Sequence, residues 1–137
     1  MFNEFDTKTF PVLLIGFNRP ELIAKRLGEL SGSTSREIYV SIDYHSPEMQ
    51  RQMEAAINNS VNSNSSNKVI TIFHDKNLGL ARHVTKAISL VLQNHDRVIV
   101  LEDDISVNEQ AIGSLCQVLG IFEIGRASCR ERVSSPV

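Results

Sequence analysis

The chain has 137 residues, of which 42% are hydrophobic and 22% are charged, which is typical of one compact domain with a single core. Its 14 basic and 16 acidic residues give a formal net charge of −2, so the charge favours neither nucleic acid nor an anionic membrane as a partner. Since no signal peptide and no long apolar segment is apparent, we expect a soluble, cytoplasmic protein without a transmembrane segment.

Four short apolar segments, rich in β-branched residues, alternate with helical patterns along the chain. They span residues 12–17, 38–42, 69–73 and 98–101. Their apolar runs are nearly continuous, which is typical of central strands covered by helices on both faces. The alternation predicts an α/β fold, with an open, mainly parallel sheet and helices on both faces.

The helical patterns lie between these strands. The first is predicted to begin at Pro20 and to end at Gly32, and the second begins at Pro47 and dissolves into the polar stretch 58–67, which we expect to be a flexible loop. Residues 81–92 form the longest amphipathic pattern. A weaker helical pattern follows over residues 112–119.

The last 15 residues differ in character from the rest of the chain. From about Glu123 the sequence EIGRASCRERVSSPV has no apolar period, and its string EIGRASCRERV looks like a translated sequencing adapter. We therefore expect a domain over residues 1–122 and a non-native tail over residues 123–137, with a natural reading frame that continues and a fold that is truncated here. The alternative is a disordered basic C-terminal tail.

Polar residues follow the predicted strands, and parallel strands deliver them to one edge of the sheet. Arg19 and Asp43 follow the first two strands, and Glu102, Asp103 and Asp104 follow the fourth. Three adjacent carboxylates after a buried strand are costly unless a cation or hydrogen-bond donors satisfy them. A hard divalent ion, Mg²⁺ or Mn²⁺, with phosphate oxygens completing its shell is the natural partner, while a solvated acidic loop, or Glu102 as a helix cap, is the alternative.

Each of the other candidate site residues can also be explained by a purely structural role. Asp43 suits a ribose or base contact, or else a turn or the cap of the helix at Pro47. Arg19 suits a diphosphate, or else the open surface. His83 lies on the third predicted helix, where a single histidine is usually structural. No role follows from sequence for the remaining histidines, His45, His74 and His95.

Three segments together resemble a known family. PVLLIGFNRP, NLGLARHVTKAI and VIVLEDDISV, in this order and at these separations, resemble the GT-A-fold glycosyltransferases, most closely the N-acetylglucosaminyltransferase I type and its bacterial hemolysin-like and family 2-like relatives. The likeness covers roughly residues 11–122. It implies the Rossmann-like, nucleotide-binding half of a metal-dependent glycosyltransferase, which takes a sugar from a nucleotide diphosphate donor, a UDP-sugar, to the hydroxyl of an unknown acceptor.

The resemblance also implies roles for single residues. Asp104 would hold Mn²⁺ or Mg²⁺, as the last acid of a DxD-like motif. Glu102 and Asp103 would face the ribose and neighbouring groups, and the donor would be contacted by the other matching residues, Arg19, Asp43 and His83. The catalytic base is expected beyond the truncation. Phe17 and the pair that follows Asp43 depart from the family pattern, which bears on the fit of the base.

Three other functions are compatible with parts of this pattern. A sugar nucleotidyltransferase should carry a glycine-rich, basic loop after its first strand, whereas residues 16–20 hold one glycine. A receiver-like regulatory domain should carry paired acids after the first strand, where Asn18 stands. A non-catalytic remnant that binds nucleotide without turnover is the third alternative.

Overall fold

A computed structural model describes residues 10–30, 36–61 and 68–105 of the chain. The elements in order are β1 (Val12–Gly16), α1 (Pro20–Leu30), β2 (Glu37–Ile42), α2 (Pro47–Val61), β3 (Lys68–Phe73), α3 (Leu80–Val91) and β4 (Ile99–Glu102). The helix predicted over residues 112–119, Gly32 and the C-terminal tail lie outside the described residues. Within the described part of the chain, no helix has the length and apolar character to cross a bilayer.

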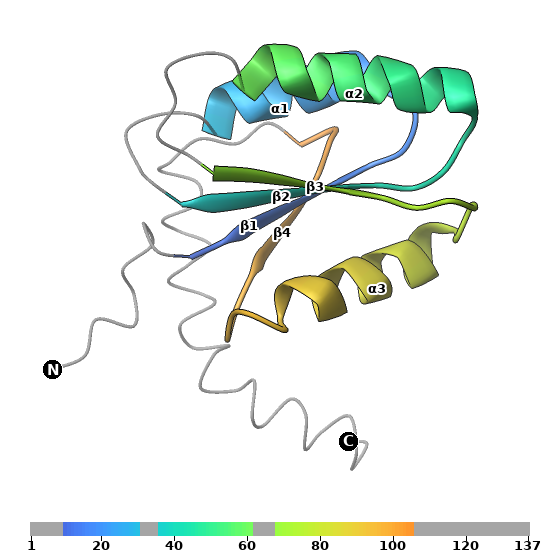
Figure 1. Cartoon of the computed structure of the whole chain (residues 1–137). Coiled ribbons are helices and arrows are strands. Elements are labelled where there is room, and N and C mark those ends of the chain that lie inside the picture. The colour runs from blue at the N-terminus through green and yellow to red at the C-terminus, as the bar shows by residue number, and fades with distance from the viewer. Residues whose placement is uncertain (1–9, 31–35, 62–67, 106–137) are drawn as a thin grey trace, which may run out of the picture.

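The four strands form one parallel sheet in the order β3-β2-β1-β4, which confirms the predicted α/β class. β1 pairs with β2 from Val12 opposite Ile38 to Gly16 opposite Ile42, and β4 pairs with the other side of β1. Figure 1 shows α1 and α2 on one face of the sheet and α3 on the other, so the predicted cover on both faces is also confirmed.

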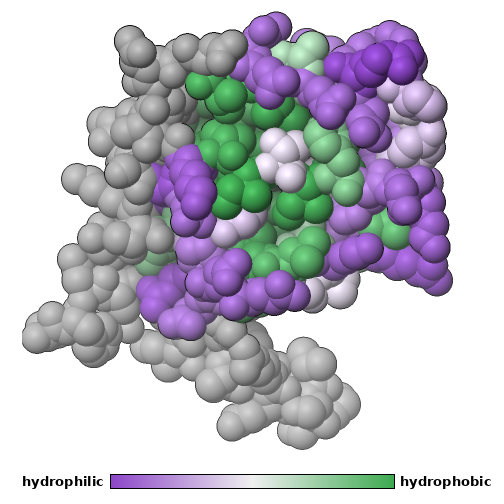
Figure 2. All heavy atoms as spheres, viewed as in Figure 1, coloured by the Kyte–Doolittle hydropathy of each residue, from purple (hydrophilic) through white to green (hydrophobic). Residues whose placement is uncertain are grey.

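The strands are not all central, contrary to the prediction. In the described sheet β3 and β4 lie at the two edges. No residue of β3 is fully buried, since it pairs with β2 on one side and has no described strand on the other. Figure 2 shows a hydrophobic area level with the sheet, bordered by hydrophilic residues above and below.

The core has two parts, one on each face of the sheet. The larger lies beneath α1 and α2 and the smaller beneath α3. At Gly16 an added Cβ would come within 2.5 Å of Cδ1 of Ile23 and 2.9 Å of Cδ1 of Ile42. The missing side chain thus lets α1 pack closely against the end of β1, next to the edge where the polar residues gather.

The second helix begins as predicted and ends later than predicted. The Ser46 hydroxyl accepts a bond from the N–H of Met49 at 3.1 Å, and Pro47 occupies the first helical position, where its missing N–H costs nothing. Four residues assigned to the flexible loop, 58–61, belong to the helix. Val61 packs against the core, and this apolar contact accounts for the longer helix. The Ser60 hydroxyl donates to the carbonyl of Ala56 at 2.8 Å within the same turn.

Candidate functional site

A cavity of about 400 Å³ opens at the carboxyl edge of the sheet. It lies beside the ends of β1 and β4, where the strand order reverses, which is the usual ligand site of an open α/β sheet. The cavity is lined by Ile15, Gly16, Phe17, Arg19, Asp43, Asn77, Gly79, Leu80, His83, Glu102 and Asp103. The structure therefore brings five of the six predicted site residues together, and Asp104 is the one outside this lining.

Arg19 and Asp103 close one side of the cavity. The guanidinium of Arg19, after β1, donates from Nη2 to Oδ1 of Asp103, after β4, at 2.8 Å. The arginine side chain is 47% exposed and the carboxylate 4% exposed, so the pair joins a buried anion to a cation that reaches solvent. Burial raises the pKa of Asp103, Arg19 lowers it, and the neighbouring Asp104 and Glu102 carboxylates raise it.

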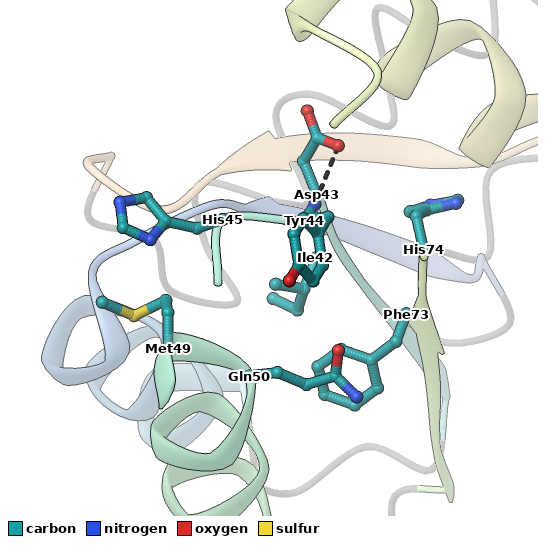
Figure 3. A pocket seen from close by; sticks show the side chains of 8 residues that line it. All are labelled: Ile42, Asp43, Tyr44, His45, Met49, Gln50, Phe73 and His74. Atoms are coloured by element: carbon teal, nitrogen blue, oxygen red, sulfur yellow. Dashed lines mark hydrogen bonds between the residues drawn. The ribbon is translucent and has the colours of Figure 1, made fainter. Parts of the chain in front are cut away.

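Asp43 lies directly after β2 and is almost fully buried. Its Oδ1 accepts from the backbone N–H of Tyr44 at 2.9 Å and of Leu78 at 2.8 Å, and its Oδ2 accepts from Gly79 at 3.0 Å. In Figure 3 the carboxylate points away from α2, toward the loop that leads into α3. Asp43 is thus not the cap of α2, a role that Ser46 takes, but an anchor for the turn before α3.

That turn brings the N-terminus of α3 to the cavity. The amide of Asn77 donates to the carbonyl of Tyr44 at 2.9 Å, which adds a second link between the β2 and β3 ends. Gly79 has φ 82° and ψ 159°, a conformation open essentially to glycine alone, and it precedes the first residue of the helix. Since the N-terminal end of a helix carries partial positive charge, this arrangement favours an anion in the cavity.

His83 lies on α3 and is 1% exposed, although part of it lines the cavity. Its Nε2 lies 2.7 Å from the Ser41 hydroxyl of β2, and the same hydroxyl lies 3.1 Å from Nε2 of His74, directly after β3. Sequence reasoning missed Ser41 and left His74 without a role. The one available signal was a hydroxyl residue inside an otherwise apolar strand segment, EIYVSI.

The three acidic residues at the end of β4 and directly after it differ in exposure. Glu102 and Asp104 are exposed, and Asp103 between them is buried. No group of three or more acidic, histidine or cysteine side chains that could hold a metal is found among the described residues. One or two exposed carboxylates with phosphate oxygens from a ligand are the arrangement that Mg²⁺ prefers, so the residues fit a cation that binds together with a phosphate.

Of the two aromatic residues Phe17 and Tyr44, which follow β1 and β2, Phe17 lines the cavity. Phe17 is 38% exposed and meets the ring of His45 edge-on, with 5.3 Å between ring centroids. Tyr44 does not line the cavity. It faces a second hollow, shown in Figure 3 between β2, β3 and α2, which is too narrow to hold even a water molecule. The larger cavity is therefore the candidate site.

Two comparisons with known proteins bear on this geometry. The family model described as "Nucleotidyl transferase" matches residues 6–118, which include all four strands and every residue that lines the cavity. No curated protein matches the chain at a significant level.

Proposed function

This chain belongs to the nucleotidyl transferase family, and from this premise we propose a function for its cavity. The cavity binds a nucleoside diphosphate sugar together with a divalent cation, as the donor site of a glycosyltransferase. One observation carries the proposal. At the point where the strand order reverses, a half-exposed guanidinium, three strand-end carboxylates and a helix N-terminus share one cavity of about 400 Å³. Membership of the family supports the coarser statement, that the chain is a transferase that acts on nucleotides.

Arg19 is the proposed contact to the diphosphate. A guanidinium has five N–H donors, and one nitrogen of Arg19 bonds to Asp103. The others remain for phosphate oxygens, which guanidinium groups bind in a bidentate manner. Asp103 holds the guanidinium at the mouth of the cavity, so in this proposal it acts on the donor chiefly through Arg19.

Asp43 and His83 are the proposed contacts to the nucleoside. Oδ2 of Asp43 accepts one hydrogen bond and can accept another from a ribose hydroxyl or a base N–H. His83 lines the same side of the cavity, on the first turn of α3. The likeness to the N-acetylglucosaminyltransferase I type supports the same roles, with Glu102 facing the ribose.

Asp104 and Glu102, whose carboxylates are exposed, would hold the cation together with the diphosphate. When bound, it supplies a positive charge that neutralises the leaving diphosphate. Asp43 has no part in holding the cation in this proposal, since three of its acceptor sites are taken by backbone N–H groups and the remaining one is assigned to the nucleoside.

Sugar nucleotidyl transfer is the second candidate, and the description of the matching family favours it. Such an enzyme must hold a nucleoside triphosphate. Only three residues, Phe17, Asn18 and Arg19, connect β1 to α1, and none of them is a glycine. A short turn with a bulky aromatic residue offers few backbone N–H groups to a triphosphate, so the geometry favours a diphosphate donor.

Calorimetric titration of UDP into the 137-residue chain tests the binding site. We expect binding with Mn²⁺ or Mg²⁺ and at least a tenfold loss in excess chelator, an order of magnitude typical of a lost charge-assisted contact. Asp104→Asn should remove the difference between the two conditions. The matched control is Asp96→Asn, which removes an exposed carboxylate from the connection between α3 and β4, away from the cavity. Equal binding of UDP with and without the cation would overturn the metal assignment.

A second assay separates the two candidate activities. The chain is incubated with UTP and glucose 1-phosphate, and pyrophosphate is measured. A parallel calorimetric titration measures binding of a UDP-hexose with Mn²⁺. Because the catalytic base is expected beyond the truncation, donor-site function predicts binding of the UDP-hexose and no pyrophosphate, whereas pyrophosphate formation would establish nucleotidyl transfer instead.

A further inference from the structure

Three buried polar side chains lie in a row between the strands and α3. His74, after β3, and His83, on α3, both approach the Ser41 hydroxyl on β2, at 3.1 Å and 2.7 Å. The two rings also meet edge-on, with centroids 5.0 Å apart. Of the three, only His83 lines the cavity. The row therefore connects the interior of the sheet to the candidate site.

The hydroxyl has only one proton, which gives the row a direction. Hydrogen bonds donated by a hydroxyl to another oxygen are typically about 2.7–2.8 Å long, shorter than the usual 2.9–3.0 Å of those donated by N–H to oxygen, and by analogy the hydroxyl proton is assigned to the shorter contact. The shorter contact is to His83 and the longer to His74. The distances thus fit His74 Nε2–H donating to Ser41, and the Ser41 O–H donating to Nε2 of His83.

The surroundings of the two histidine rings favour their neutral forms, which the assigned direction of hydrogen bonding requires. Burial lowers the pKa of His74, as does Lys86 on α3, while Asp43 and Asp75 oppose this. Burial likewise lowers the pKa of His83, with Asp43 opposing and His74 reinforcing the effect. A neutral imidazole has one N–H, so at neutral pH each ring donates from one nitrogen and accepts at the other.

We propose that His74 and Ser41 are positioning residues that hold His83 as its Nδ1–H tautomer and so present an N–H donor to an acceptor oxygen of the nucleoside diphosphate. With Nε2 engaged by Ser41, Nδ1 is the remaining polar atom of His83, and no partner for it is found among the described residues. An Nδ1–H group selects an oxygen acceptor over a donor group. The contact between His83 and the nucleoside diphosphate rests on the proposed function, whereas the tautomer of His83 does not.

The fold gives the row its rigidity. Ser41 and Asp43 are two residues apart on β2 and its end, so they face the same side of the sheet, toward α3. Asp43 fixes the turn before α3 through Leu78 and Gly79, and Ser41 fixes the first turn of the helix through His83. One strand thereby sets both the position of the helix and the orientation of its histidine.

Long-range ¹H–¹⁵N NMR correlations of the full chain at pH 7.5 test the tautomers directly. We expect Nδ1–H for His83 and Nε2–H for His74, without any ligand present. In Ser41→Ala, His83 should become a mixture of both tautomers. An Nε2–H tautomer of His83 in the unsubstituted chain would overturn the proposal, whether or not UDP binds.

UDP titrations with Mn²⁺ test the consequence for binding. Loss of one hydrogen bond predicts that Ser41→Ala weakens UDP binding by about 3-fold to 10-fold. His74→Phe should also weaken it, and His74→Gln, which keeps an N–H donor, should restore most of the affinity. The matched control, Ser89→Ala, removes an exposed hydroxyl of α3 and should have no effect. Unchanged affinity in both Ser41→Ala and His74→Phe would overturn the positioning role. Failure of the unsubstituted chain to bind UDP would instead refute the proposed function and leave the NMR result to decide the tautomers.

Discussion

At the scale of single residues, Asp43 serves two requirements of the site. Its carboxylate accepts three backbone hydrogen bonds, two of them from the turn before α3, and it also lines the cavity. The strand-end position of this acid was predicted from the sequence. Its bonds to Leu78 and Gly79 were not, because contacts between residues 35 and 36 positions apart leave no local pattern in the chain.

Asp43→Asn is expected to weaken UDP binding by about tenfold or more while leaving the affinity for inorganic diphosphate nearly unchanged. An amide has one acceptor oxygen in place of two, so the substitution removes the acceptor proposed for the nucleoside and keeps the size of the side chain. Competitive titration of the two ligands measures both affinities. Equal losses would mean that the residue acts only through the turn that it anchors.

Two buried histidines make the stability of the chain depend on pH. Burial lowers the pKa of both His74 and His83 in the folded state. Below about pH 6.5 the unfolded chain therefore binds protons that the folded chain excludes, so stability is present above that pH and is lost as the pH falls. Each histidine can contribute a slope of up to about 1.4 kcal/mol per pH unit.

Urea unfolding at pH 7.5 and pH 5.5 measures this effect, since the window lies above the range in which most carboxylates titrate. The midpoint should be lower at pH 5.5, and His74→Phe should reduce the difference. An unchanged midpoint would show that the two rings take up protons equally well in both states.

At the scale of elements, the turn from β3 into α3 depends on one backbone conformation. Gly79 has φ 82° and ψ 159°, and within the described part of the chain an added Cβ would meet nothing within 4 Å. The cost of a side chain here is therefore backbone strain rather than a clash. The N–H groups of this turn donate to Asp43, which lines the cavity, so a strained turn is expected to displace Asp43.

Gly79→Ala is expected to lower the free energy of unfolding by about 1–3 kcal/mol and to weaken UDP binding. Gly28→Ala is a matched control, because Gly28 lies exposed inside α1 and an added Cβ would meet no atom of the described residues within 4 Å. This variant should gain about 0.5–1 kcal/mol. Denaturant unfolding of both variants provides the comparison. A neutral Gly79→Ala variant would show that the turn tolerates another conformation.

The elements themselves were largely predictable. Apolar runs and helix start signals located every described strand and helix to within a few residues. The sequence could not show that α2 continues through residues 58–61, since polar residues there look like a loop until Val61 is seen to contact the core. Nor could it show that β3 lies at an edge of the described sheet, because apolar composition does not reveal which strands pair.

At the scale of the whole molecule, the two ends of the sheet carry different polar clusters. At the amino end, the Tyr39 hydroxyl donates to Oε1 of Glu37 at 2.8 Å, and Nε2 of His95 lies 3.0 Å from the same oxygen. The bonds from Tyr39 and His95 lower the pKa of Glu37, and burial raises the pKa of Tyr39 to about 12. This cluster ties the start of β2 to the connection between α3 and β4, at the end of the sheet away from the cavity.

We therefore expect a substitution at the amino end of the sheet to change stability, and one at the carboxyl end to change UDP binding. Glu37 and Asp43 are six positions apart, which corresponds to about 20 Å of extended strand. Glu37→Ala removes the shared partner of the buried Tyr39 and the half-buried His95, which among the described residues keep only their contact with each other at 3.1 Å. The substitution should therefore lower the free energy of unfolding by about 1–2 kcal/mol and leave the affinity for UDP unchanged. Glu102→Ala, which removes an exposed carboxylate at the cavity, should show the reverse.

Urea unfolding and UDP titration with Mn²⁺, applied to both variants, provide the four measurements. The expected pattern follows from a parallel sheet that uses one end to fasten its connections and the other to bind ligand. If Glu37→Ala weakened UDP binding as much as Glu102→Ala, the two ends would be coupled through the strands. The cavity would then have to be treated as part of the same cooperative unit as the amino-end cluster.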